Sequence, residues 1–552
     1  MTNPAIVLVS NDHADFLLDE FGRYARDYDL LTATTFEDGA RLVKQLEAGG
    51  RPLALMVADS ALRETTPVQT FGKWRQLVPT AKRVVVAHWD RFLTDAPSLR
   101  AGLATGKYDA YLLMPRGVRD EEFHTAITEL LSDWGSTVAE PEIETVRVVS
   151  PPGNALASSI RDFLDRMGMP NRTYDPSTEI GREIVERYDG EPAYPLVDSP
   201  YRDVHAPASV REVAAAVYGR PEDIDVDSVV DLCIVGAGPA GLAAAVYGSS
   251  EGLNTVVVEV EAIGGQAGTS SMIRNYLGFP RGISGMRLAQ RARNQAIRFG
   301  TRFFTGWEVT SVAACEHGDH HVVRTDGGEI HTRSVVVATG VRYRKLGIEA
   351  LERMVGQGVY YGSAMSAARE LEGQDVVVVG GGNSAGQAAI HLARFARSVT
   401  ILVRRSGLEE TMSRYLIKEI DWNPRVAVRP DSEVCDGGGE GRLEWVDVRS
   451  RSTGDVERLT VGGLFLLLGA EPHCDWLPHD LARDDRGFVQ TGRDVPPEAW
   501  GNGLPPASLA TSVPGVFAVG DVRAGSMKRV AAASGEGASV VPLVHAFLTP
   551  PA

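Results

Sequence analysis

The sequence predicts an α/β protein of several domains, because three of its features point the same way. The chain has 552 residues, whereas a single domain holds roughly 100 to 200. Apolar strand-like runs alternate with helical stretches over residues 1–134, the pattern of a parallel sheet with helices on both faces. Farther along, two glycine-rich segments each join a strand to a helix, as in doubly wound folds.

Composition and charge narrow the class of protein. Hydrophobic residues make up 43% and charged residues 23% of the chain, which indicates an ordinary globular protein. A net charge of -16 disfavours nucleic acid and anionic membrane partners. We find no apolar run of roughly 18 residues and no basic leader at the N-terminus. We therefore expect a cytoplasmic protein with neither a nucleic-acid nor a membrane partner.

The cysteines argue against disulfides and metal sites. The chain has four, which lie far apart and form no C-x-x-C pair: Cys233, Cys315, Cys435 and Cys474. No zinc-ligand spacing is apparent among them and the histidines. We therefore expect no metal site.

The first module, residues 1–134, has strand-like runs at 6–9, 53–57, 83–87 and 110–114, which predict a flavodoxin-like doubly wound sheet. The module resembles a response-regulator receiver domain, and Asp59 takes the place of the phospho-acceptor. The acidic metal pocket is reduced to Ser10, Asn11 and Asp12, which disfavours magnesium-dependent phosphotransfer. Ala87 and Met114 replace the usual hydroxyl residue and lysine. We interpret the module as a degenerate receiver that contacts a protein partner; the alternative is a weakly phosphorylatable regulator.

The second module, residues 145–219, has a strand at 146–150 and a helix at 154–168. It resembles a thioredoxin or glutaredoxin fold, in which Tyr194-Pro195 takes the place of the cis-proline. Its loop, Ser150 to Gly153, contains no thiol. An ordinary proline at the edge of a strand is the alternative interpretation.

The first glycine-rich segment fits a dinucleotide-binding turn. Gly236, Gly238 and Gly241 form G-x-G-x-x-G between a strand and a helix. The glycines allow a tight turn, close approach of a pyrophosphate and close helix packing. Glu259 follows 23 residues after Gly236, where an acid binds ribose hydroxyls.

The second glycine-rich segment repeats this pattern but lacks the acid at the end of its second strand. Gly380, Gly382 and Ala385 form G-x-G-x-x-A, but the position 23 residues after Gly380 is valine rather than an acid. Arg404 and Arg405 come next. Guanidinium groups there favour a 2'-phosphate, and thus NADP over NAD. The alternative is that both arginines only form a solvated strand end.

From residue 229 onward the motifs occur in a familiar order. Segments 264–285, 335–348, 465–477 and 511–541 accompany the two glycine turns. Together they resemble the low-molecular-weight thioredoxin reductase branch of the pyridine nucleotide-disulfide oxidoreductases. The resemblance implies a split FAD-binding domain (229–341 and 464–552), an inserted NADPH-binding domain (342–463) and a homodimer.

The resemblance also implies the cofactor contacts. The residues expected to bind FAD are Gly236, Ala237, Gly238, Pro239, Ala240, Gly241, Glu259, Gly264, Gly265, Gln266, Asn275, Val309, Thr339, Gly340, Gly520, Asp521, Arg529 and Val530. Those expected to bind NADPH are Gly380, Gly382, Asn383, Ser384, Ala385, Arg404 and Arg405.

The chain departs from the family at the redox-active dithiol. In that place stand Gly362, Ser363, Ala364 and Met365, which cannot form a reversible disulfide. No catalytic residue is therefore assigned. Tyr360 and Tyr361 either line the flavin face or simply pack.

Without a dithiol in this place, the sequence does not identify the electron acceptor. We expect hydride from NADPH to reach FAD and the electrons to pass to a quinone, a redox protein, another small oxidant or O2. One alternative is a redox- or nucleotide-sensing signalling protein that uses the degenerate receiver. The other is a thioredoxin reductase that uses thiols of a partner.

Overall fold

The computed structural model describes residues 3–549 except 105, 138–143, 201, 219–227, 271, 316–317, 363–364 and 501–502. The chain forms two compact units. The first consists of Met1–Glu140, Leu371–Val376 and Gly381–Asp431. The second consists of Pro141–Glu370, Val377–Gly380 and Ser432–Ala552.

The N-terminal module of the first unit is built on a parallel five-stranded sheet. Its strands are β1 (Ala5–Val9), β2 (Asp29–Ala33), β3 (Leu53–Asp59), β4 (Lys82–Ala87) and β5 (Ala110–Leu113). They lie in the order β2-β1-β3-β4-β5, which is the 2-1-3-4-5 order of doubly wound sheets of the flavodoxin type. Every residue of β1, β3 and β4 is buried, which accounts for their continuous apolar runs.

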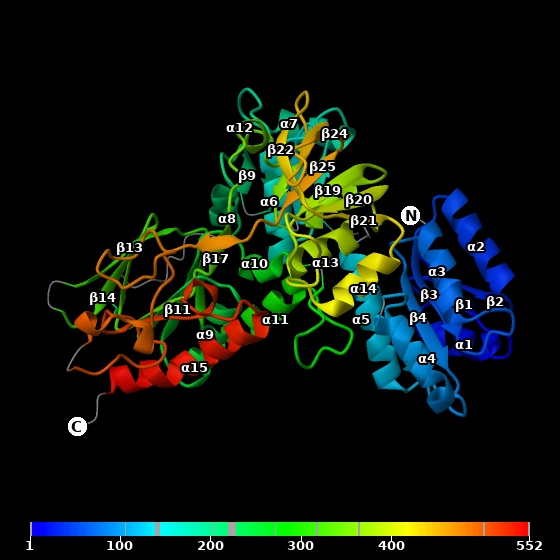
Figure 1. Cartoon of the computed structure of the whole chain (residues 1–552), viewed down its shortest axis with the longest axis horizontal. Helices are drawn as coiled ribbons and strands as arrows, with labels where there is room; N and C mark the ends of the chain where they lie inside the picture. The colour runs from blue at the N-terminus through cyan, green and yellow to red at the C-terminus, as the bar shows by residue number, and fades with distance from the viewer. Residues whose placement is uncertain are drawn as a thin grey trace. The chain divides into compact units, whose positions relative to one another are not determined.

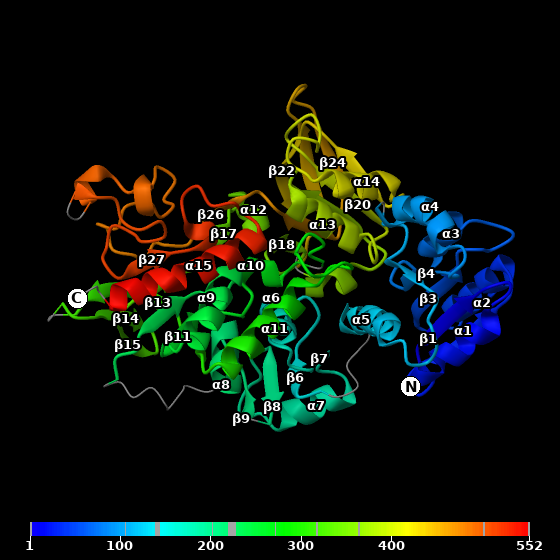
Figure 2. The same ribbon diagram turned by 90° about the horizontal axis from the view of Figure 1, so that it is seen from below.

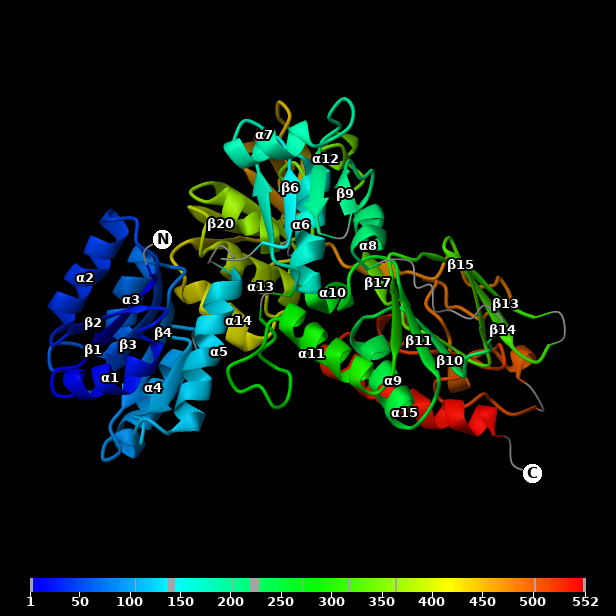
Figure 3. The same cartoon turned by 180° about the vertical axis from the view of Figure 1, so that it is seen from behind.

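Helices cover both faces of this sheet (Figure 3). They are α1 (Ala14–Phe21), α2 (Phe36–Ala48), α3 (Pro67–Leu77), α4 (Phe92–Ala104) and α5 (Glu121–Thr137). Val43 of α2 and Trp74 of α3 belong to the core cluster on one face. Phe21 of α1 and Ile127 of α5 belong to the cluster on the other.

The second module opens the second unit with a mixed sheet (Figure 2). Its strands are β6 (Val146–Val149), β7 (Asn171–Tyr174), β8 (Leu196–Ser199) and β9 (Arg202–His205). Its helices are α6 (Ala155–Met167), α7 (Glu179–Glu186) and α8 (Val210–Tyr218). The order is β7-β6-β8-β9, with only the β6–β7 pair parallel. The Tyr194–Pro195 bond is cis, as predicted; the predicted end at residue 219 lies outside the described residues.

The next fold has a parallel sheet completed by a strand from near the C-terminus. The strands are β10 (Leu232–Val235), β11 (Thr255–Glu259), β12 (Arg302–Thr305), β16 (Val335–Val337) and β27 (Val516–Ala518). They lie in the order β12-β11-β10-β16-β27. Because β27 pairs with β16 across the inserted chain, the fold is split as predicted.

An antiparallel sheet packs on one face of this parallel sheet. It consists of β13 (Val309–Ala314), β14 (His321–Thr325) and β15 (Gly328–Thr332). Val312 and Ile330 share a core cluster with Cys233 and Val256 of the parallel sheet. The antiparallel sheet therefore covers the strands that lead to the first glycine turn.

Helices pack on the other face of the parallel sheet. They are α9 (Pro239–Ser250), α10 (Gly265–Gly268), α11 (Gly285–Arg298) and α15 (Val530–Leu548). Figure 1 shows α15, in red, alongside α9. By length and composition α15 could span a membrane. Its Ala533, Val540 and Val544 are instead buried in the core cluster that includes Ala240 of α9.

The inserted fold has a second parallel sheet in the order β18-β25-β19-β20-β21. The strands are β18 (Val359–Tyr361), β19 (Asp375–Val379), β20 (Ser398–Leu402), β21 (Val426–Arg429) and β25 (Gly463–Leu466). The helices are α12 (Glu349–Glu352), α13 (Asn383–Leu392) and α14 (Arg414–Trp422). The antiparallel strands are β22 (Ser432–Gly438), β23 (Trp445–Ser450) and β24 (Val456–Thr460).

The boundary of the inserted fold differs slightly from the predicted one. The predicted end at residue 463 is the first residue of β25, so the inserted sheet continues to Leu466. A two-stranded ribbon of β17 (Val341–Tyr343) and β26 (Ala470–Pro472) joins the two ends of the insertion. Short 3-10 helices complete the described elements: η1 (Gly22–Tyr24), η2 (Met365–Leu371), η3 (Gly492–Asp494), η4 (Pro497–Ala499) and η6 (Gly520–Val522).

Two glycines of α15 provide a matched test of the packing between α15 and α9. A Cβ added to Gly537 would lie 2.1 Å from the carbonyl oxygen of Ala240, whereas one added to Gly535 meets nothing within 4 Å. We expect Gly537→Ala to destabilise the fold by about 1 to 3 kcal/mol through overpacking. We expect Gly535→Ala to stabilise it by about 0.5 to 1 kcal/mol through helix propensity. Opposite shifts of the thermal unfolding midpoint would confirm this; equal shifts would contradict it.

Candidate functional site

The first glycine turn leads from β10 into α9 with backbone groups in very close contact. Gly236 has φ +103, and a Cβ there would lie 2.5 Å from the carbonyl oxygen of Ala338. A Cβ on Gly241 would lie 1.9 Å from the carbonyl oxygen of Gly236. Gly238, the N-cap of α9, faces open space instead. The turn thus leaves room at the helix N-terminus, where a pyrophosphate is stabilised.

Glu259 is held at the end of β11 by two backbone groups. The N–H of Ala237 donates to Oε2 at 2.8 Å, and the N–H of Glu261 donates to Oε1 at 3.1 Å. Burial raises the pKa of Glu259, and these two hydrogen bonds oppose that rise. The carboxylate is thereby oriented beside the glycine turn, and each oxygen keeps a lone pair with which to accept a ribose hydroxyl.

A third segment, 264–266, lies against the same turn. Gly264 and Gly265 have φ values of +106 and +53. A Cβ on Gly265 would lie 3.1 Å from the Cα of Gly238. The side chain of Gln266 donates a hydrogen bond to the carbonyl of Val341. These three predicted residues therefore do lie beside the glycine turn.

Two loops at neighbouring strand ends complete this group. Thr339 and Gly340 follow β16, and the Thr339 hydroxyl donates to the carbonyl of His473 at 2.5 Å. Gly520 and Asp521 follow β27, and a Cβ on Gly520 would lie 2.9 Å from the Cβ of Ala240. Since β10, β16 and β27 are parallel neighbours, these loops share one edge of the sheet, the usual ligand edge of such folds.

Asp521 and the start of α15 lie at this edge too. Burial raises the pKa of Asp521, and the positive charge of Lys528 opposes that rise. Arg529 is the N-cap of α15, and Val530 is its first residue. Just before this helix begins, the Lys528 side chain donates to the carbonyl of Asp521 at 3.0 Å.

Two other residues that are predicted to contact the flavin lie outside this group of loops. Asn275 lies on an exposed turn between the bridging residues Ile273 and Ile283. Val309 is buried in the cluster formed with Trp307 and Ile330. For both residues, flavin contact stays a prediction.

Glu536 and Arg166 support the site, although the sequence analysis did not identify them. Glu536 accepts from the N–H of Gly520 at 2.7 Å and pairs with Arg523 at 2.5 Å. Its signal in the sequence is a lone acid in the otherwise apolar helix α15. Arg166 of α6 donates to the carbonyls of Ala262 and Gly265 at 3.0 and 3.1 Å, a contact that only the tertiary fold creates.

The second glycine turn joins β19 to α13. Gly380 has φ +147, and Gly382, the N-cap of α13, faces open space just as Gly238 does. The Thr411 hydroxyl donates to the carbonyl of Gly381 at 2.7 Å. The Asn383 side chain accepts from the N–H of Ser413 at 2.7 Å. These bonds fix the turn and leave its helix N-terminus free for a phosphate.

The residues after β20 carry the predicted nucleotide specificity. Val403 is buried, whereas Arg404 and Arg405 are exposed. Arg405 pairs with Glu410 at 3.0 Å, and both side chains are more than half exposed. An exposed pair of this kind is weak, so a ligand phosphate could replace Glu410 as the partner of Arg405.

Residues 362–365, predicted to take the place of the family dithiol, follow β18. Ser363 and Ala364 lie outside the described residues, and Met365 begins η2. Gly362 has φ +83, and a Cβ there would lie 2.7 Å from the ring of Tyr343. The space beside this backbone is therefore filled by an aromatic ring.

Tyr360 and Tyr361 pack within the inserted fold. Tyr360 stacks on Phe465 with ring centroids 5.0 Å apart. The Tyr361 hydroxyl donates to Glu352 at 2.5 Å and accepts from the N–H of Leu346 at 2.7 Å. Burial raises the pKa of each tyrosine to about 12. Of the two sequence-based alternatives for this pair, these contacts support packing.

Asp59 of the N-terminal module is enclosed by the module's own groups. Its Oδ2 accepts from the Ser10 hydroxyl at 2.7 Å and lies 3.0 Å from Nδ1 of His13. Its Oδ1 accepts from the N–H of Ala61 at 2.9 Å. A phospho-acceptor needs a free carboxylate oxygen and a bound cation, and here a histidine and a serine occupy the polar positions.

Comparisons with known proteins agree with this geometry. The family model described as pyridine nucleotide-disulphide oxidoreductase matches residues 230–537. A thioredoxin reductase of Treponema pallidum (strain Nichols) is 33% identical over 310 residues, which cover 56% of this chain and 94% of that protein. A 34.2 kDa protein in the rubredoxin operon of Clostridium pasteurianum is 30% identical over 308 residues, covering 56% of this chain and 94% of that protein.

A solved structure shows the same fold over the same part of the chain. The crystal structure of Lactococcus lactis thioredoxin reductase (FR conformation) aligns with a TM-score of 0.52 at 29% identity. The alignment covers 58% of this chain and 99% of that one. With two glycine turns on two parallel sheets and these relatives, the chain belongs, through residues 230–537, to the pyridine nucleotide-disulphide oxidoreductase family.

Proposed function

We propose that the protein is an FAD-dependent NADPH oxidoreductase whose electron acceptor is not a dithiol of its own chain. The acceptor classes are a quinone, a redox protein, another small oxidant or O2. One observation carries the proposal: both nucleotide-binding turns are intact, while the sequence around Gly362 has no cysteine pair. A bound FAD would supply the hydride acceptor, since no side chain can take up two electrons from a nicotinamide.

The residues on the first parallel sheet fit FAD. Gly236 and Gly238 would let the pyrophosphate approach the N-terminus of α9. The oriented carboxylate of Glu259 would accept hydrogen bonds from the ribose. Asp521, at the neighbouring strand end, would bind the ribityl chain, as the family resemblance implies.

The inserted fold fits NADPH. Gly382 would place a phosphate at the N-terminus of α13. Val403 adds no negative charge near a 2'-phosphate, and Arg404 and Arg405 add two positive ones. The electrostatics therefore favour NADPH over NADH.

The cysteines support an acceptor outside the chain. All four are free. Cys233 is fully buried in β10, and burial raises the pKa of its thiol to about 12, far from a reactive thiolate. Cys474 is buried and its thiol donates to the carbonyl of Gly487 at 3.1 Å. Cys315 and Cys435 belong to different antiparallel sheets. No two of them form the dithiol that disulfide exchange requires.

Family membership supports two further parts of the proposal. Thioredoxin reductases are among the relatives that match this chain in fold and over nearly their whole length, and we propose that this chain forms a homodimer. We also propose a cytoplasmic location, where NADPH is available and free thiols such as these four persist.

A second function is favoured by a contact inside the first unit. Arg75 of α3 and Lys107 both lie over the ring of Trp422 in α14, at 5.5 and 5.1 Å. The buried Arg75 also approaches Glu419 of α14 at 4.0 Å. Because α14 follows the Arg404–Arg405 loop, the N-terminal module can sense or alter nucleotide binding, as a signalling protein would require.

The specificity prediction is tested by anaerobic titration of the flavin. NADPH is expected to bleach the protein at lower concentration than NADH. Replacing both arginines (Arg404→Ala, Arg405→Ala) removes charge-assisted bonds worth about 1.5 to 3 kcal/mol each, so kcat/KM for NADPH should fall at least tenfold while that for NADH stays within about twofold. Arg353→Ala, an exposed arginine of the same insertion, is the control. Equal losses for both nucleotides would contradict the assignment.

The acceptor prediction is tested by removing every thiol. A variant with all four cysteines changed (Cys233→Ala, Cys315→Ser, Cys435→Ser, Cys474→Ala) is expected to keep more than half of its NADPH-driven quinone reduction, because no thiol carries electrons. The native chain is expected not to reduce oxidised thioredoxin. Turnover of thioredoxin that survives in the variant would instead support a reductase that uses partner thiols, and loss of quinone turnover with flavin retained would implicate a cysteine.

The signalling alternative is tested at Trp422. If the N-terminal module is coupled to nucleotide binding, Trp422→Ala is expected to change the Kd for NADPH by about fivefold or more, the lower range of allosteric coupling. Lys107→Ala, which leaves α14 intact, should shift the Kd in the same direction. Trp445→Ala, in another sheet, is the control. An unchanged Kd in both variants would leave the module without a role in nucleotide binding.

A further inference from the structure

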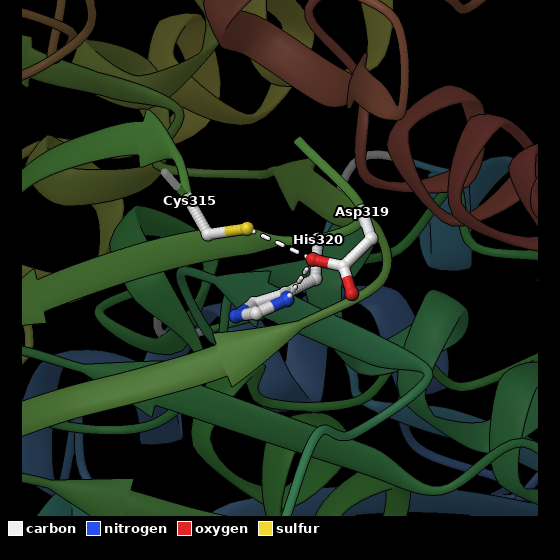
Figure 4. A group of neighbouring side chains, drawn as sticks. All are labelled: Cys315, Asp319 and His320. Carbon is white, nitrogen blue, oxygen red and sulfur yellow. Dashed lines mark hydrogen bonds and ion pairs between the residues drawn. The ribbon is translucent and has the colours of Figure 1, made fainter. Parts of the chain in front are cut away.

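Three metal-ligating side chains meet at the end of the β13–β14 hairpin. Cys315 follows β13, and Asp319 and His320 precede β14. Their Sγ, Oδ1 and Nδ1 atoms all lie within 4.8 Å of one another. Asp319 Oδ1 is 2.9 Å from the thiol sulfur and 2.7 Å from Nδ1 of His320, and Figure 4 shows the thiol and the imidazole on either side of that oxygen.

The backbone of the hairpin holds these residues in register. The N–H of Cys315 donates to the carbonyl of His320 at 2.9 Å. The N–H of Gly318 donates to the carbonyl of Cys315 at 3.0 Å, and Gly318 has φ +73. The positions of Cys315 and His320 are therefore fixed relative to each other by main-chain bonds, before any ligand is present.

His331 holds the far side of the imidazole. Its Nδ1 lies 2.9 Å from Nε2 of His320, and it belongs to β15, paired with β14 through Val322. A metal-bound histidine characteristically donates its second ring N–H to such a partner, which fixes the tautomer and the ring orientation. In a metal-bound form, with Nε2 donating to His331, the lone pair of Nδ1 would face an ion shared with Cys315 and Asp319.

The charge balance also suits a cation. The acid Asp319 places its Oδ1 beside both the Cys315 thiol and the His320 ring, so one negatively charged ligand lies between two others. Without a metal ion, Asp319 accepts one hydrogen from the Cys315 thiol and one from the His320 ring. A divalent ion would replace these two protons and leave a thiolate, a carboxylate and a neutral imidazole around it.

Thiolate, imidazole and carboxylate are the three ligand types that bind zinc in proteins. With Zn–S near 2.3 Å and Zn–N and Zn–O near 2.1 Å, tetrahedral binding sets ligand atoms about 3.4 to 3.6 Å apart. The oxygen contacts of 2.7 and 2.9 Å would therefore widen by about 0.7 Å. Asp319 can make this movement, because 73% of its side chain is exposed.

We propose that Cys315, Asp319 and His320 bind one zinc-type divalent ion, with water in the fourth position and His331 as the positioning residue. The sequence predicts no metal site, since Cys315 and His320 do not form a familiar zinc spacing. The proposal is independent of the proposed redox function, because the cluster belongs to the antiparallel sheet and not to the glycine-turn edge.

Cobalt titration of the full chain tests the proposal. The purified protein is treated with a chelator, desalted anaerobically and titrated with Co2+. We expect one equivalent to bind with the red-region absorption of four-coordinate cobalt, where oxidised flavin does not absorb, and a near-ultraviolet thiolate-to-cobalt band in the difference spectrum. Added Zn2+ should displace Co2+ and abolish both signals, because zinc binds tetrahedral nitrogen and sulfur ligands more tightly than cobalt does.

Matched variants assign the ligands. Cys315→Ser should remove the thiolate band, whereas Cys435→Ser, a partly exposed cysteine in another sheet, should keep it. His320→Ala should weaken Co2+ binding at least a hundredfold. His331→Ala should weaken it by about tenfold to a hundredfold while the thiolate band persists, the behaviour of a positioning residue. Retained flavin shows that each variant is folded.

Two results would overturn the proposal. A thiolate band that persists in Cys315→Ser would place the cobalt elsewhere. Absence of a stoichiometric cobalt spectrum in the native chain would mean that the three side chains form a hydrogen-bonded cluster only. Either result leaves the NADPH titration unaffected, so failure of the metal site and failure of the proposed redox function are distinguishable.

Discussion

Close backbone contact around α9 is the constraint on which the split fold around β10, β16 and β27 depends. At Gly241 and Gly537 a single added carbon would come within about 2 Å of a main-chain carbonyl oxygen. The first contact seats α9 against the turn after β10, and the second seats α15 against α9. Because α15 follows β27, these contacts bring the C-terminal segment back to the edge where the first glycine turn lies. The two separate segments of this fold therefore pack together at Gly241 and Gly537, where no side chain would fit.

The two glycine turns share one backbone geometry, but the residues that follow the next strand differ in charge. Gly238 and Gly382 both cap a helix and both face open space. After the first turn an acid, Glu259, is held by main-chain N–H groups; after the second, exposed arginines follow a buried valine. The backbone supplies the shared affinity for phosphate, and the few side chains at the strand ends separate one dinucleotide from another.

The two N-terminal modules are α/β folds, and the side chains predicted for their reactive positions are either enclosed or replaced. Asp59 is enclosed by Ser10, His13 and a backbone N–H, and the loop before α6 contains Pro151 and Pro152 and no cysteine. Both modules nevertheless make contacts with other folds of the chain. Arg166 binds the carbonyls beside the first glycine turn, and Arg75 lies against Trp422. Each contact joins a module to a neighbouring fold within the same compact unit.

The sequence by itself determined the α/β class, both glycine turns and the absence of any C-x-x-C pair, because each depends on residues close together in the chain. Glycine spacing and strand periodicity are local signals. The tertiary structure decided the features that depend on distant segments: the bond from Glu536 to Gly520, the packing of Tyr360 on Phe465, the continuation of the inserted sheet to Leu466 and the meeting of His331 with His320. These contacts form only when strands pair and helices pack. Local patterns do not specify which partners meet, whether they are 11 residues apart, as His320 and His331 are, or separated by most of the inserted fold, as Tyr360 and Phe465 are.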